Sequence, residues 1–164
     1  MSNLGPCFLN LDVAILADIS KSMNETHRAQ LTTFVNDLVT KLGISSGGKH
    51  FGLITFGPDA TLHNDFNDTK FHNETSFKNL VSQAVGYVPD KWGTRIDLAM
   101  NQAATQLFIP AGGDRADAKN VLLLFTDGEQ FIGKWDTRPL IPSSNLTATL
   151  EVTDFIVYFK TIPV

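Results

Sequence analysis

Short, nearly continuous apolar runs constrain the fold of this chain more than any other feature. They occupy residues 11–17 (LDVAILA), 50–56 (HFGLITF), 120–125 (NVLLLF) and 154–159 (DFIVYF). Strands that are apolar at almost every position are typical of parallel sheets whose two faces are both covered by helices. The sequence therefore predicts a sheet buried between two helical layers.

Helical patterns fill most of the intervals between these strands. Apolar residues recur at helical spacing over residues 24–42, 74–85 and 94–108, and a weaker pattern covers 143–151. A short strand at residues 60–66 follows a tight turn, so we expect it to be an antiparallel edge strand. The whole pattern predicts a doubly wound α/β fold, with a mostly parallel sheet and helices on both faces.

Oxygen-bearing side chains gather where two buried strands end. Asp18, Ser20 and Ser22 follow the first strand, Asp127 follows the fourth strand in chain order, and Thr94 opens the helix between them. Ligands of such sheets bind beyond the carboxyl ends of the strands, so these loops meet if the two strands are neighbours. Their oxygens suit Mg²⁺ or Mn²⁺. Taken alone, the first loop has another interpretation, which is that its Asp and Ser cap the following helix.

Four residues beside these loops are candidates for the rim of a partner-binding site. They are Trp92, Glu129, Phe131 and Trp135. Exposed aromatic side chains are common anchors in protein interfaces. The alternative is that the two tryptophans pack onto neighbouring loops and that the glutamate is a solvated loop residue.

Composition excludes several classes of partner. The net charge is −4 and no cluster of Lys or Arg is present, which argues against nucleic-acid binding. No apolar run approaches the roughly 20 residues that span a bilayer. With 43% hydrophobic residues in 164, residues 1–164 are expected to form a single domain.

Four acceptor patterns for N-glycosylation favour an extracellular location, either secreted or in the ectodomain of a larger protein. They begin at Asn24, Asn67, Asn73 and Asn145. Cys7 is the only cysteine, so no disulfide can form within this sequence. It is either a buried thiol or the partner of a cysteine elsewhere.

The order and context of the five oxygen ligands carry a family resemblance. Asp-x-Ser-x-Ser stands at residues 18–22, Thr94 follows a Gly, and Asp127 lies in Thr-Asp-Gly. With these motifs on these elements, the chain resembles the von Willebrand factor type A domain family, which includes the integrin inserted domains. The resemblance covers residues 11–159, and matches spread over three loops are far more specific than one short motif.

The resemblance implies a metal-ion-dependent adhesion site. In it Ser20, Ser22 and Thr94 would ligate Mg²⁺ or Mn²⁺ through their hydroxyls, while Asp18 and Asp127 would bind directly or through water. An Asp or Glu carboxylate from a partner would complete the coordination. The implied function is a cation-dependent adhesion or protein-binding module rather than an enzyme. Its ligand stays open among collagen, another matrix protein, a cell-surface receptor and a second copy of the chain.

The chain departs from the family pattern at its end. Family members continue past the fifth strand with a helix, a sixth strand and a final helix, so we expect a C-terminally shortened domain. The strand at 154–159 would then be an exposed edge, which predicts a homodimer or a self-assembling matrix domain as an alternative function. The family often pairs a cysteine before the first strand with one after the last helix, an arrangement that Cys7 half fits. A metal-assisted phosphohydrolase is less favoured, because only Lys21 and Arg95 stand near the metal loops as cations.

Overall fold

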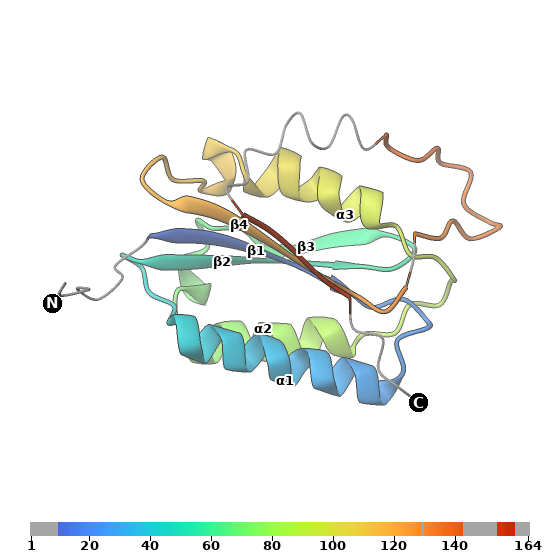
Figure 1. Cartoon of the computed structure of the whole chain (residues 1–164), viewed down its shortest axis with the longest axis horizontal. Coiled ribbons are helices and arrows are strands. Elements are labelled where there is room, and N and C mark those ends of the chain that lie inside the picture. Colours follow the sequence, from blue (N-terminus) through green and yellow to red (C-terminus); the bar gives the residue numbers. More distant parts are fainter. Residues whose placement is uncertain (1–9, 129, 143–153, 160–164) are drawn as a thin grey trace, which may run out of the picture.

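A five-stranded sheet forms the centre of the computed structural model, which describes residues 10–128, 130–142 and 154–159. The strands are β1 (Leu11–Asp18), β2 (Lys49–Phe56), β3 (Ala60–Asn64), β4 (Lys119–Thr126) and β5 (Asp154–Phe159). Their order in the sheet is β3-β2-β1-β4-β5 (Figure 1). All neighbouring pairs are parallel except β2 and β3, which are antiparallel. The predicted mostly parallel sheet with one antiparallel edge strand is therefore confirmed.

Helices cover both faces of this sheet, as predicted. The helical elements are α1 (Glu25–Leu42), α2 (Glu74–Gly86), α3 (Ile96–Gln102), the π-helical η2 (Ala103–Leu107) and two 3₁₀ turns, η1 (Thr69–Phe71) and η3 (Pro110–Gly112). Figure 1 shows α1 and α2 against one face and α3 against the other. The central strand β1 is buried between the two layers, which explains its lack of polar–apolar alternation.

Alternate residues of β1 enter two separate cores. Val13, Ile15 and Ala17 pack with residues of α1 and α2, whereas Ala14 and Leu16 pack with residues of α3 and η2. Successive side chains of a strand point to opposite faces, so one strand supplies both cores. The residues in the middle of β1 therefore all pack in a core, and its polar side chains lie near its two ends.

Two predicted elements differ from the structure by more than one residue at an end. The third strand ends at Asn64 rather than at residue 66. There the Asn64 side chain takes the place of the backbone hydrogen bonds to β2, because it accepts from the Leu53 N–H at 3.1 Å and donates to the Phe51 carbonyl at 2.8 Å. The helix predicted over 94–108 is α-helical only to Gln102. It continues as a π-helical turn, in which the Phe108 N–H donates to the Ala103 carbonyl five residues earlier.

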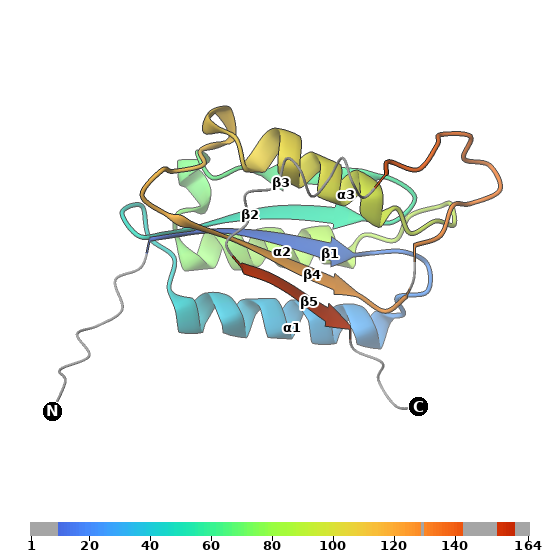
Figure 2. The same cartoon turned by 45° about the horizontal axis from the view of Figure 1, so that its top comes forward.

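The strand β5 is the outermost strand of the described sheet on the β4 side (Figure 2). The helix predicted over 143–151, as well as Cys7, lies outside the described residues. Within the described part of the chain, no helix combines the length and the apolar character needed to cross a membrane.

Candidate functional site

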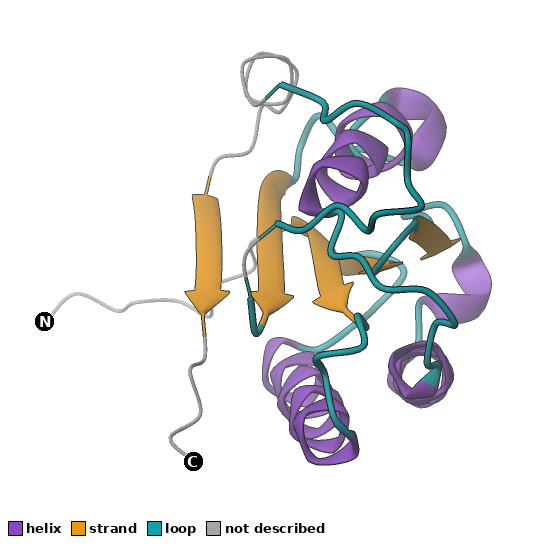
Figure 3. Cartoon of the chain, turned by 90° about the vertical axis from the view of Figure 1, so that its right-hand side faces the viewer, coloured by secondary structure: helices purple, strands orange, loops and turns teal. Residues whose placement is uncertain are grey.

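The loops after β1 and β4 meet because these strands are parallel neighbours. Their pairing runs in register from Leu11 opposite Lys119 to Ala17 opposite Phe125, so both strands end at the same edge of the sheet (Figure 3). Asp18, at the end of β1, accepts a hydrogen bond from the Thr126 hydroxyl at 2.6 Å. The arrangement on which the predicted metal site depends is therefore present.

A chain of hydrogen bonds joins four of the five predicted metal ligands. The Asp18 carboxylate accepts from the backbone N–H of Ser20 at 2.7 Å, and the hydroxyl oxygens of Ser20 and Ser22 are 3.0 Å apart. The Ser22 hydroxyl donates in turn to Asp127 at 3.0 Å. The helix-capping interpretation of this loop is wrong, because α1 is capped by the side chain of Asn24.

The fifth predicted ligand, Thr94, approaches through backbone contacts. The N–H of the next residue, Arg95, donates to the Gly57 carbonyl at 2.7 Å, and Gly57 lies directly against Ser20. Thr94 is itself buried, at 7% exposed. The structure thus links the third loop to the first one through the turn that contains Gly57.

The carboxylate of Asp18 is buried, and within the described residues it has no ion-pair partner. Its residue is 0% exposed. Burial raises the pKa of Asp18, hydrogen bonds from Ser20 and Thr126 oppose that rise, and the neighbouring charge of Asp127 adds to it. A cation at this point would supply the missing positive charge.

Two residues that the sequence analysis did not single out support the site. Arg28 is buried and donates to the carbonyls of Ile19, Ser20 and Met23 in the first loop. It also donates to the carbonyls of Val85 and Tyr87 at the C-terminal end of α2, so one guanidinium ties the loop to a second element. The other supporting residue is His27, whose Nδ1 lies 3.8 Å from an oxygen of Asp127.

A weak sequence signal for Arg28 exists. It occupies the apolar face of α1 with Leu31 and Val35, where an arginine must either extend to solvent or find buried acceptors. Burial lowers the pKa of its guanidinium, while the charges of Asp18 and Asp127 raise it. Its five carbonyl acceptors are what make burial of the charged form tolerable.

The three aromatic side chains predicted for the rim are exposed. Trp92, Phe131 and Trp135 are 57%, 50% and 38% exposed. Trp135 also packs locally, as the alternative interpretation expected, because its indole N–H donates to the Trp92 carbonyl at 2.9 Å. Glu129 lies outside the described residues.

Of the predicted glycosylation positions, Asn24, Asn67 and Asn73 are exposed, and Asn145 lies outside the described residues. Asn24 and Asn73 cap α1 and α2 through their side-chain oxygens. Only the amide nitrogen of Asn24 is free of a hydrogen bond among these three, since Asn67 and Asn73 donate to the carbonyls of Ala111 and Lys70.

The donor set fits a hard divalent cation rather than a soft one. The five predicted ligands are two carboxylates and three hydroxyls, which are all oxygen donors. A site of the other common kind, built from three or more His, Cys, Asp or Glu side chains, is absent from the described residues. The hydrolase alternative loses one of its two cations, because Arg95 is fully buried in ion pairs with Asp97 and Asp136. The other, Lys21, places its Nζ 5.7 Å from the Trp92 ring centroid.

Several known proteins are similar to this chain. Matrilin-4 of Homo sapiens is 31% identical over 79% of the chain, and the collagen alpha-1(XX) chain of Mus musculus is 30% identical over 72%. Integrin alpha-M of Mus musculus is 26% identical over 85% of the chain. The chain spans 21%, 9% and 12% of the lengths of these three relatives, respectively.

Solved structures show the same fold. Proximal thread matrix protein 1 from the mussel byssus superimposes with a TM-score of 0.73 at 22% identity, covering 92% of this chain and 37% of that chain. A second structure of that protein, described as having a zinc-occupied MIDAS motif, gives a TM-score of 0.72. The family model for the von Willebrand factor type A domain matches residues 12–158. The chain therefore belongs to the von Willebrand factor type A domain family.

Proposed function

We propose that this chain is a divalent-cation-dependent protein-binding module. Asp18, Ser20, Ser22, Thr94 and Asp127 would hold the cation, which would accept an Asp or Glu carboxylate from a partner protein. Hydroxyl ligands leave a divalent cation with residual positive charge, so an incoming carboxylate gains both charge attraction and coordination. We further propose that residues 1–164 act as one domain.

The observation that carries this proposal is the state of the Asp18 carboxylate. It is fully buried, forms no ion pair with a described residue, and lies in a hydrogen-bonded chain with Ser20, Ser22 and Asp127. A structural aspartate would be expected to have an ion-pair partner. The lack of one is explained if the cation is a bound metal.

The choice of metal follows from the ligands. Mg²⁺ and Mn²⁺ are the first candidates, because both favour oxygen donors and retain positions for other ligands. Zinc is a third, since the similar mussel protein is described with zinc at its MIDAS motif. All three belong in the same titration.

The relatives suggest where such a module would act. They are a collagen, a matrilin and an integrin, which supports an extracellular matrix or ectodomain setting. Collagen or another matrix protein is therefore a reasonable first partner to test. The exposed Trp92, Phe131 and Trp135, together with Glu129, would form the rim that contacts it.

The test is binding to a panel of immobilised matrix proteins, collagen among them, in Mg²⁺, in Mn²⁺ and in chelator. We expect binding in either metal and its loss in chelator. Ser20→Ala and Asp127→Asn should each abolish it, because each removes one ligand from the coordination shell. Ser82→Ala, which removes an exposed hydroxyl of α2, is the matched control and should bind as wild type.

Calorimetric titration with Mg²⁺, Mn²⁺ and Zn²⁺ separates the metal from the partner. The proposal fails if none of the three metals binds the wild-type chain. It also fails if partner binding survives chelator and both ligand substitutions.

A second candidate function is self-assembly through β5. This strand pairs with β4 and, within the described residues, has no strand on its other side. An open edge presents backbone donors and acceptors to another chain. Light scattering over a concentration series tests this candidate, and a constant monomer mass would rule it out.

A further inference from the structure

The loop that carries Phe131 and Trp135 is clamped to the start of α3 by buried ion pairs. Arg95 is 0% exposed and makes two hydrogen bonds of 2.8 Å to Asp97. A third, of 2.7 Å, goes from Arg95 to Asp136 in the loop, whose side chain is 2% exposed. Asp97 also accepts from the backbone N–H of Ile141 at 3.0 Å, so the far end of the loop is held as well.

An outer arginine completes the clamp. Arg138 binds Asp136 from the solvent side and donates to the carbonyl of Pro58 at 2.9 Å, and it forms an ion pair with Asp59. These two residues belong to the turn between β2 and β3, so the loop is tied to the sheet as well as to α3. The buried contacts of Arg95 and the more exposed ones of Arg138 together hold the loop in one conformation.

The same loop joins the segment that carries Trp92 and Thr94. Thr94 and Phe131 exchange two backbone hydrogen bonds, of 2.8 and 2.9 Å. A side chain at Gly133 would approach the Trp92 carbonyl to 2.2 Å, so only glycine permits this contact. The two segments therefore form one continuous surface next to the predicted metal ligand Thr94.

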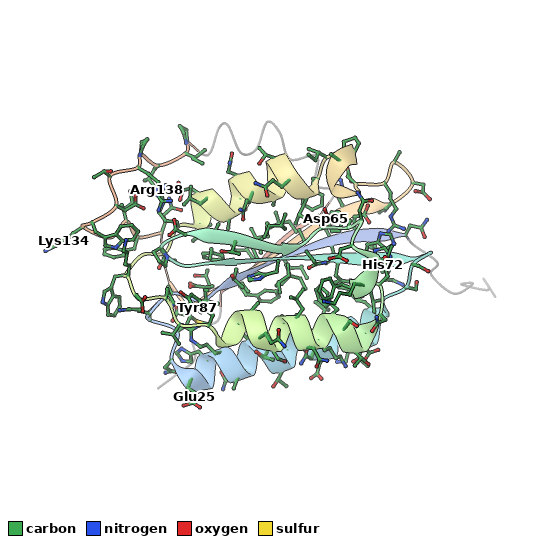
Figure 4. The ribbon with its side chains drawn as sticks, turned by 180° about the vertical axis from the view of Figure 1, so that it is seen from behind. Glu25, Asp65, His72, Tyr87, Lys134 and Arg138 are labelled. Atoms are coloured by element: carbon green, nitrogen blue, oxygen red, sulfur yellow. The ribbon has the colours of Figure 1, made fainter. Side chains whose placement is uncertain are left out.

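This surface combines exposed rings with lysines, and we call it the rim platform. Its members are Lys21, Lys91, Trp92, Phe131, Lys134 and Trp135. The Nζ of Lys91 lies 4.2 Å from the Trp135 ring centroid. Lys134 projects outward at the same end of the molecule as Tyr87 and Arg138 (Figure 4). Among the described residues of the two segments, Asp90 is the single acid without an ion pair.

We propose that the rim platform selects an extended protein segment in which the metal-binding carboxylate is flanked by further acidic residues and by an apolar or aromatic residue. This inference rests on the proposed function, because the central carboxylate is the one that the cation would bind. The three lysines complement added negative charge, and the exposed face of Phe131 requires an apolar counterpart.

The clamp is what makes this selection effective. A loop that is already ordered loses little conformational entropy when a partner binds. Less of the free energy gained from contacts with Phe131 and Trp135 is therefore spent on ordering the loop, and the affinity is higher. Each lysine lies at the edge of the rim platform, where a single solvent-exposed ion pair contributes little to the binding free energy. We therefore expect the aromatic contact to have the larger effect and the lysines to act together.

The test uses short fluorescent peptides, each with a central Glu, whose flanks are acidic and aromatic, neutral, or basic. Anisotropy in Mg²⁺ should show the acidic–aromatic peptide binding about tenfold more tightly than the neutral one. Phe131→Ser should weaken the acidic–aromatic peptide by about tenfold. Lys91→Glu and Lys134→Glu should each weaken it by about threefold. Lys119→Glu, an exposed lysine at the opposite end of the sheet, should have no effect.

The outcomes separate this inference from the proposed function. Equal, Mg²⁺-dependent binding of the acidic and neutral peptides overturns the rim platform and leaves the proposed function intact. A chain that binds no metal and no peptide overturns both. Binding of the acidic–aromatic peptide that persists in chelator, or equal binding of a sulfated polysaccharide, shows a general anion patch and also overturns the inference.

Discussion

The central strand β1 carries a buried aspartate at each end, and the two differ in what surrounds them. Asp12 accepts three hydrogen bonds from Arg115, of 2.8, 2.9 and 3.0 Å. Asp18, six positions later on the same face of the strand, accepts hydrogen bonds only from neutral donors, Ser20 and Thr126. Both aspartates are 0% exposed. One end of the strand is thus paired with an arginine of the protein itself, whereas the other is where we propose that an external cation binds.

The surroundings of the two carboxylates reinforce this difference. Near Asp12, the rings of His50 and His72 stack with centroids 3.9 Å apart, and His50 Nδ1 lies 4.0 Å from Asp12. Figure 4 shows His72 at the end of the molecule away from Lys134. The Asp12 end is a closed network of ionic and aromatic contacts, whereas Asp18 is hydrogen-bonded only to neutral groups. Both aspartates are buried, so it is the lack of an ion pair, rather than burial, that marks Asp18 as the proposed metal ligand.

The largest expected effect comes from removing the counter-charge of Asp12. Arg115→Met should lower the free energy of unfolding by about 3 kcal/mol, because it leaves a buried carboxylate unpaired. This value is at the low end for such changes, since the Arg115 side chain is 21% exposed. Urea unfolding measures it. Lys119→Met is the control, and a loss equal to that of the control would contradict the closed-network description.

Substituting Asp18 should have the opposite sign in the metal-free protein. Burial raises the pKa of Asp18, so at neutral pH its ionised form disfavours the folded state. Asp18→Asn removes that charge, and Thr126 can still donate to the Gly128 carbonyl. We expect a gain on the order of 1 kcal/mol in chelator. Asp12→Asn should instead destabilise, and equal signs for the two variants would break the comparison.

A smaller effect is expected from pH at the Asp12 end. Burial lowers the pKa of His50, Arg115 and His72 lower it further, and the Ser46 carbonyl and Asp12 oppose this shift. The neutral form is therefore favoured by folding. Stability from this residue is present above the ordinary pKa of 6.5 and is lost as the pH falls from there towards the lowered pKa.

Thermal unfolding of the wild type and His50→Gln across this pH range checks the prediction. The variant should show a shallower fall in Tm, although not a flat one. Burial also lowers the pKa of His63, which contributes in the same direction. Parallel curves for the two proteins would assign the fall to other groups.

The arrangement of the candidate site could be predicted because it depends on strand direction. Asp18, Thr94 and Asp127 are far apart in sequence, but the ends of parallel neighbouring strands share one edge of the sheet. The apolar runs predicted the strands, and the runs are near-continuous because β1 enters two cores. The sheet order inferred from these apolar runs therefore agrees with the observed pairing of β1 with β4.

Side-chain networks could not be predicted in the same way. Arg115 and Asp12 are separated by more than one hundred positions, and nothing local indicates that they pair. Arg28 resembles any arginine at the edge of an apolar helix face until its five carbonyl acceptors are known. Arg95 stands next to Thr94 and is one of the two cations that the sequence places near the metal loops. In the structure its charge is paired with Asp97 and Asp136. Such partners depend on loop conformation, which sequence periodicity does not encode.

Metal-dependent stability tests the central claim most directly. A ligand that binds only the folded state at 100 times its Kd stabilises it by about 2.7 kcal/mol. We predict that saturating Mg²⁺ or Mn²⁺ raises the free energy of unfolding of the wild type and of Asp12→Asn equally, and leaves Asp18→Asn unchanged. Equal stabilisation of Asp18→Asn, or no stabilisation of the wild type by either metal, would contradict the account.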